Sequence, residues 1–257
     1  MWVSHDPGGA LSRGALAWDD MSRIQYSFRL VTMARTAAKD TTVKKVRGAG
    51  ARDPERTSAS ILAAAVTEFT EKGFAGARID AIALKSGSNK RMIYHYFGDK
   101  DGLYLAVLES AYVGIRSSEA ELQLGDLEPA QAIERLIDFT WDYFIAHPEF
   151  LSLLSTENLH RAKFLKKSKR VLQLHSPLVS MIADVLKRGT ETGVFRRGAD
   201  PVYVYISIAS LGIFYLSNRW TLSTIFARDL MAQPEIRAWG RHISSVILGY
   251  LRPGNAA

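Results

Sequence analysis

Residues 78–97 read RIDAIALKSGSNKRMIYHYF, and this stretch decides how the rest of the chain is interpreted. It predicts a short helix, a tight turn that contains Gly87, and a second short helix with Asn89 as its N-cap. The second helix opens with two cations, Lys90 and Arg91, and ends in the aromatic run YHYF. Two short helices joined in this way form a helix–turn–helix, a motif that places its second helix in the major groove of DNA.

A helix before this segment is expected to brace it. The helix begins at Asp53 with the letters DPE, which combine an N-cap residue, a proline at the first helical position and an acid near the positive end of the helix dipole. Apolar residues then recur every four positions from Ile61 to Phe69 and give the helix one apolar face. Gly73 is placed to end it.

The composition is that of an ordinary globular protein, with 47% hydrophobic and 23% charged residues. The net charge of +7 permits a polyanionic partner. The absence of cysteine excludes disulfides, thiolate metal sites and cysteine nucleophiles. The longest nearly apolar run, 202–216, is too short for a comfortable membrane span, and the N-terminus lacks the apolar core of a signal peptide. We therefore expect a cytoplasmic protein without a membrane partner.

The helical period continues to the C-terminus, with no useful alternation of period two. The sequence thus predicts an all-α fold in which a helix–turn–helix DNA-binding domain at 53–98 precedes a helical regulatory and dimerisation domain at 99–257. The expected helices of the second domain lie near 99–118, 128–146, 148–159, 170–192, 200–218 and 233–251.

Residues 1–52 differ from the rest in composition and show no sustained helical period. This pattern predicts a flexible extension. Its basic residues form either a solvated tail or an arm that adds phosphate or minor-groove contacts to DNA. Met21 and Met33 raise the hypothesis that translation starts downstream. The basic residues before the first helix are Arg35, Lys39, Lys44, Lys45, Arg47 and Arg52.

The N-terminal pattern resembles that of tetracycline-repressor (TetR) family regulators over residues 55–112. The resemblance implies a homodimer that binds a double-stranded DNA operator and responds to a small-molecule effector, whose identity the sequence does not give. Ala77 departs from the Thr or Ser often found there, so a helix cap is missing, and Ser88 replaces an apolar turn residue. The matching residues are 74–76, Ile82, Ala83, Gly87, 94–97, Lys100, Leu103 and Tyr104.

The expected DNA contacts lie on the second helix of the motif and around it. Lys90 and Arg91 can donate to guanine O6 and N7, while Met92 either touches a thymine methyl or belongs to the core. A cation at a helix start is normally unfavourable, so Lys100 is either a solvated side chain or, as the resemblance to the family favours, the partner of a DNA phosphate bound there. The predicted DNA-binding residues are Asn89, Lys90, Arg91, Met92, Tyr94, His95, Lys100 and Thr57.

The effector pocket that the resemblance implies has only compositional support in the sequence. Mixed aromatic and polar residues suit a pocket, although core packing explains each of them as well. Glu157 and Asn218 are the favoured polar contacts. The candidate ligand-binding residues are Trp141, Tyr143, Glu157, Asn158, Met181, Phe214, Asn218 and Trp220.

Two helices, 202–216 and 236–251, are expected to form the dimer interface, with buried Gly212 and Gly249 permitting close approach. The alternative is an architectural DNA-binding protein without a ligand, or less favourably an all-α enzyme. The histidines show no four-residue pairing suited to a metal, and no catalytic constellation stands out. We therefore expect no catalytic residue, no metal and no cofactor.

Overall fold

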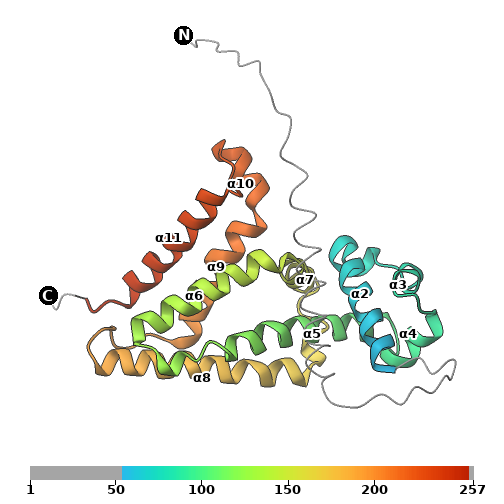
Figure 1. The fold of residues 1–257 in the computed structure, drawn as a ribbon, viewed down its shortest axis with the longest axis horizontal. Coiled ribbons are helices and arrows are strands. Elements are labelled where there is room, and N and C mark those ends of the chain that lie inside the picture. Colours follow the sequence, from blue (N-terminus) through green and yellow to red (C-terminus); the bar gives the residue numbers. More distant parts are fainter. Residues whose placement is uncertain (1–53, 255–257) are drawn as a thin grey trace, which may run out of the picture. The chain divides into compact units, whose positions relative to one another are not determined.

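The computed structural model describes residues 54–254, and over this range the chain is helical without a β-strand (Figure 1). The predictions for residues 1–52, for Met21 and Met33 as starts and for the Asp53 cap lie outside the described residues. The N-terminal helices are α2 (Pro54–Gly76), α3 (Ile79–Lys85), α4 (Lys90–Phe97) and α5 (Lys100–Ala120).

The rest of the chain forms longer helices separated by two short 3₁₀ turns, η1 (Leu124–Asp126) and η2 (Leu165–Lys167). The all-α prediction is confirmed. The helices of this part are α6 (Pro129–Ala146), α7 (Pro148–Leu159), α8 (Lys169–Glu191), α9 (Pro201–Ser217), α10 (Arg219–Phe226) and α11 (Gln233–Leu251).

The predicted helix ends agree with the structure to within two residues for α5 to α9 and for α11. Prolines at the first turns of α6, α7, α9 and α11 mark these starts because their missing N–H needs no partner there. The prediction missed α10. Its first turn has no side-chain cap, its sequence RWTLSTIF has a high share of β-branched and hydroxyl residues, and it bends from α9 by 69°.

A first hydrophobic core joins α2, α3, α4 and α5. Ile61, Ile82, Ile93 and Tyr104 bring one fully buried side chain each from these four helices. Leu153 of α7 and Phe164 after it complete the same core. The helix–turn–helix packs on its bracing helix α2, and α2 in turn packs on α7.

A second core lies between α6, α8, α9 and α11 and includes the later part of α5. Gly212 of α9 is buried, and a Cβ there would come within 3.1 Å of Phe144 on α6, so the close approach is made inside the chain. Gly249 is exposed in the single chain, where a Cβ would meet nothing within 4 Å, so its place in a dimer interface stays a prediction. The apolar residues of α11 that turn inward are instead Ile236, Ile243 and Ile247.

In the part of the chain that the structure describes, no single helix is long and apolar enough to cross a membrane. Only α9 and α10 taken together reach the required length and apolarity, and the sharp bend between them interrupts that pair.

Candidate nucleic-acid interface

The first helix of the motif, α3, is anchored at both ends by one buried carboxylate. Glu68 of α2 accepts a hydrogen bond from the backbone N–H of Arg78 (3.3 Å) and one from Lys85 Nζ (3.1 Å), and it pairs with Lys72 (3.0 Å). Burial acts to raise the pKa of Glu68, but these hydrogen bonds outweigh it and lower the pKa. Glu68 thus replaces the cap that Ala77 lacks, since the Arg78 N–H lies at the start of α3.

The turn between α3 and α4 is fixed by backbone geometry and by a cap. Gly87 has φ 63°, a left-handed conformation that glycine adopts without a Cβ penalty. The Asn89 Oδ1 accepts a hydrogen bond from the N–H of Met92 at 3.0 Å, which confirms Asn89 as the N-cap of α4. Ser60 of α2 also donates to the Ser86 carbonyl (3.0 Å) and so ties the turn to the bracing helix.

The side chains of α4 divide into an inner and an outer face. Ile93 is fully buried, and Met92 packs against the first core. Lys90, Arg91 and His95 are exposed, and Tyr94 retains 47% of its surface in solvent. The outer face therefore presents two cations and two aromatic rings with polar atoms, a combination that can donate to base edges and phosphates.

One of these cations already has a partner. Lys90 Nζ forms an ion pair with Asp80 on α3, and both side chains are more than half exposed. An exposed pair of this kind contributes little to stability, so separating Lys90 from Asp80 costs little free energy. The sequence reading did not identify Asp80, because the pair joins two helices across the turn.

Lys100, at the start of α5, has two contacts on the end of α2. Its Nζ donates to the Ala75 carbonyl at 3.4 Å and lies 5.0 Å from the centre of the Phe74 ring. The ammonium is thereby held against the C-terminal end of α2. Gly102 is required in the first turn of α5, because a Cβ would come within 2.1 Å of the Phe97 carbonyl oxygen. Thr57 is half-buried in the first turn of α2.

The candidate ligand-binding residues do not gather at one place. Glu157 is buried and accepts hydrogen bonds from the N–H groups of Phe164 (2.8 Å) and Leu165 (2.9 Å), which holds Phe164 in the first core. Trp141 is buried in the second core and donates to the Ile236 carbonyl (3.2 Å). Asn218 donates to the Phe214 carbonyl (2.8 Å).

The other candidates differ in exposure. Tyr143 and Met181 are partly buried against the second core. Asn158 lies in solvent, and Phe214 and Trp220 keep 60% and 70% of their surfaces exposed. A single pocket made of all eight residues is therefore not present in the described structure.

A buried polar cluster that the sequence reading missed links α5 to α9. Arg116 and Glu119 of α5 are almost completely buried and form an ion pair (Nη1 to Oε2, 2.8 Å). Arg116 Nη2 donates to the Tyr205 hydroxyl on α9 at 2.5 Å. Burial raises the pKa of Glu119 to about 7, against the opposing charge of Arg116. The cluster fastens the helix that follows the DNA-binding motif to α9.

Two family profiles match the chain. The profile described as bacterial regulatory proteins of the tetR family covers residues 61–107, and the profile described as the tetracyclin repressor-like C-terminal domain covers residues 129–247. The HTH-type transcriptional repressor NicS of Pseudomonas putida is 40% identical over 205 residues, which are 80% of this chain and 97% of NicS. The chain belongs to the TetR family of transcriptional regulators.

Solved structures of TetR-like regulators share the fold. The putative transcriptional regulator SCO4942 from Streptomyces coelicolor has a TM-score of 0.57 at 24% identity and matches 76% of this chain and 98% of its own. The regulator FadR of Bacillus subtilis, solved with stearoyl-CoA, has a TM-score of 0.56 at 13% identity and matches 76% of this chain and 99% of its own. In this TetR-family chain, the first profile spans the helix–turn–helix, and the second spans α6 to most of α11, including Leu153 and Phe164 of the first core.

Proposed function

We propose that this TetR-family regulator is a repressor that binds a palindrome-like DNA operator as a homodimer and is released by a small-molecule effector. The observation that carries the proposal is the outer face of α4, where Lys90 and Arg91 project from a first turn fixed by the Asn89 cap. A rigid first turn lowers the entropic cost of placing a guanidinium on a base edge. The proposal includes a cytoplasmic location and no enzymatic activity.

Dimerisation is supported by apolar side chains that one chain leaves exposed on α9 and α11. Tyr203 and Ile206 keep 67% and 53% of their surfaces in solvent, and Val246 and Tyr250 keep 42% and 47%. The two helices also pack against each other. A face of this kind suits a second copy of the chain, and a two-fold dimer explains a palindromic operator with half-sites about 34–36 Å apart.

Effector response requires that the second core influence the position of the motif. Two connections support this: the Arg116–Tyr205 hydrogen bond between α5 and α9, and the packing of α7 on α2. A ligand that binds one arrangement of these helices better than another shifts the population toward the arrangement it prefers.

The roles of α4 and Lys100 are tested by measuring affinity for a selected operator and for a scrambled duplex. Arg91→Ala is expected to reduce the difference in binding free energy between the operator and the scrambled duplex by about 1–3 kcal/mol, because a base contact disappears. Lys100→Ala is expected to weaken binding to both duplexes alike and to reduce the salt slope by about one, because a phosphate contact disappears.

The control for both variants is Arg197→Ala, which changes an exposed cation in the loop between α8 and α9. It should leave both affinities within twofold of the wild type. If Arg91→Ala and Lys100→Ala also behave like the wild type, α4 is not the reading helix and the proposed interface is wrong.

A further inference from the structure

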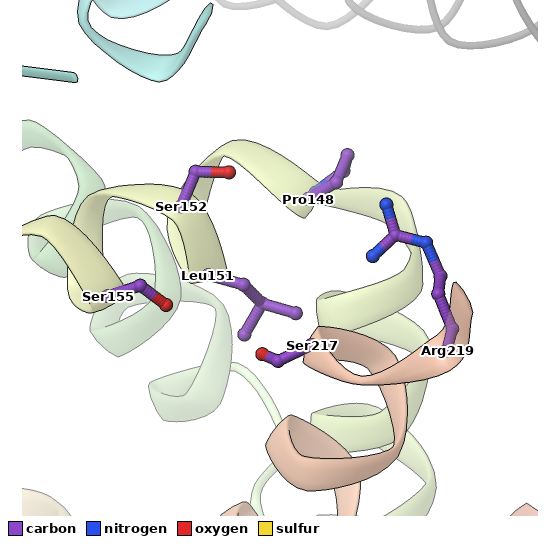
Figure 2. Close-up of a pocket in the computed structure, with 6 residues that line it drawn as sticks. All are labelled: Pro148, Leu151, Ser152, Ser155, Ser217 and Arg219. Atoms are coloured by element: carbon purple, nitrogen blue, oxygen red, sulfur yellow. The ribbon is translucent and has the colours of Figure 1, made fainter. Parts of the chain in front are cut away.

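A hollow of about 300 Å³ opens between α7 and the corner at which α9 meets α10 (Figure 2). This volume is at the lower end of the range for small-molecule sites. The side chains on its walls come from the start and middle of α7 and from the two residues flanking Asn218. They are Pro148, Leu151, Ser152, Ser155, Ser217 and Arg219.

The serines of this hollow have hydroxyls that remain available. A helical serine often donates to a carbonyl one turn earlier, as Ser207 does to Tyr203 at 2.8 Å. Within the described residues, the hydroxyls of Ser152, Ser155 and Ser217 make no hydrogen bond. Figure 2 shows them bordering one space from two sides, where they can donate to a ligand oxygen.

Arg219 brings a positive charge to the same space and is held in position. Its Nη1 donates to the Leu216 carbonyl at 2.6 Å, and its guanidinium lies 5.2 Å from the centre of the Trp220 ring. No carboxylate pairs with it anywhere in residues 54–254. A guanidinium fixed by one N–H keeps other N–H groups for an anion, and a carboxylate matches their geometry.

We propose that this hollow is the effector site of the regulator and that it binds a small organic carboxylate. The inference rests on the proposed function, because it assigns the ligand of a ligand-responsive repressor. Arg219 pairs with the carboxylate, and the serine hydroxyls donate to its oxygens. Leu151 and Pro148 cover the apolar part of the ligand. One guanidinium balances one negative charge, so a monocarboxylate fits better than a dianion such as phosphate.

The position of α7 explains how the ligand reaches the DNA-binding motif. One part of α7 lines the hollow through Leu151, and Leu153 lies in the first core with residues of α2 to α5. The helix also packs along α2, whose Glu68 holds both ends of α3. A ligand bridging α7 and the α9–α10 corner therefore selects a position of α7, and α2 and α3 follow it. Operator affinity changes as a result.

The experiment uses the full chain with sodium benzoate as the probe and sodium chloride at matched ionic strength as the reference. Thermal unfolding and operator affinity are measured for the wild type, Arg219→Gln and Arg197→Gln. Benzoate at millimolar concentration should raise the Tm and weaken operator binding at least fivefold in the wild type and in Arg197→Gln. Arg219→Gln should still bind operator but should lose both responses.

Three outcomes would overturn the inference. The first is that benzoate has no effect on the wild type, and the second is that it acts equally on Arg219→Gln. The third is that inorganic phosphate acts as strongly as benzoate, which removes the carboxylate assignment. The readouts also separate this inference from the proposed function. If the wild type binds no operator, the proposed function is contradicted. The effector site is tested separately, because the rise in Tm with benzoate and its dependence on Arg219 are measured without DNA.

Discussion

Asp80 on α3 forms an ion pair with Lys90, which lies on the outer face of α4 that we propose contacts DNA. We expect Asp80→Asn to raise operator affinity several-fold, because it releases the ammonium and removes a negative charge that faces the phosphates. The gain should be larger at low salt. Fluorescence anisotropy at two salt concentrations measures it.

The matched control for Asp80→Asn is Glu71→Gln, which neutralises another exposed acid of the same domain. A loss of affinity in Asp80→Asn, or a gain of equal size in Glu71→Gln, would show that Asp80 does not compete for Lys90.

Ionisation of Glu119 makes the free energy of unfolding depend on pH, and the shift of its pKa fixes the direction of that dependence. The pKa of Glu119 is about 7 in the folded chain and 4.5 for an ordinary glutamate, because burial disfavours its charge. Between these values the folded state keeps a proton that the unfolded state releases. The free energy of unfolding therefore falls as pH rises from about 4.5 to about 7 and is flat above that, as far as this group is concerned.

Urea unfolding at pH 5 and pH 8 tests this sign with Glu119→Gln. The variant should gain stability relative to the wild type on going from pH 5 to pH 8, because glutamine does not ionise. Glu121→Gln, which changes an exposed acid at the end of α5, should show no such gain. An unchanged difference between Glu119→Gln and the wild type at the two pH values contradicts the assignment.

At the scale of elements, α3 depends on a side chain of α2. We expect Glu68→Ala to lower the free energy of unfolding by about 1–3 kcal/mol, because the Arg78 N–H and two lysines lose their acceptor. Operator affinity should fall as well, since α3 positions the turn before α4. The matched control is Glu71→Ala, which removes an exposed carboxylate 3.5 Å from Lys85. Equal losses in the two variants would refute the anchoring role.

The pH dependence at Glu68 has the opposite sign to that at Glu119. Its pKa is lowered in the folded chain, so its stabilising contribution is present above about pH 4.5 and is lost as pH falls through the lower value.

The sequence was a good guide to elements whose ends carry local signals. Asn89 caps the helix that it was expected to cap, and Gly73, placed at the expected helix end, interrupts α2 with φ 64°. The segment that forms α10 carries no comparable signal, because its start lacks a side-chain cap and none of its residues is buried. The Glu68 anchor was also missed, since it joins residues 10 and 17 positions apart.

The candidate effector residues were harder to predict than the helices. Aromatic and polar residues along a helix do not reveal which ones face the same space, and Glu157, a favoured candidate, bonds to backbone N–H groups beside the first core. The hollow depends on how α7 meets the α9–α10 corner (Figure 2), and no periodic pattern encodes that contact.

At the scale of the whole molecule, the proposed dimer depends on the exposed apolar face of α9. Ile206→Asp should convert the dimer to a monomer at micromolar concentration, because a charge would be buried at the interface. Sedimentation equilibrium measures the mass. Leu159→Asp, at the exposed end of α7, is the control and should remain dimeric. A dimer of unchanged affinity in Ile206→Asp would place the interface elsewhere.

Selection of bound duplexes from random DNA decides whether α4 reads a two-fold operator. We expect the full chain to enrich an inverted repeat with half-sites about one helical turn apart or somewhat more. Arg91→Ala should relax the preference at the same position of both half-sites. Enrichment of no sequence, or of a motif that Arg91→Ala leaves unchanged, would contradict the claim.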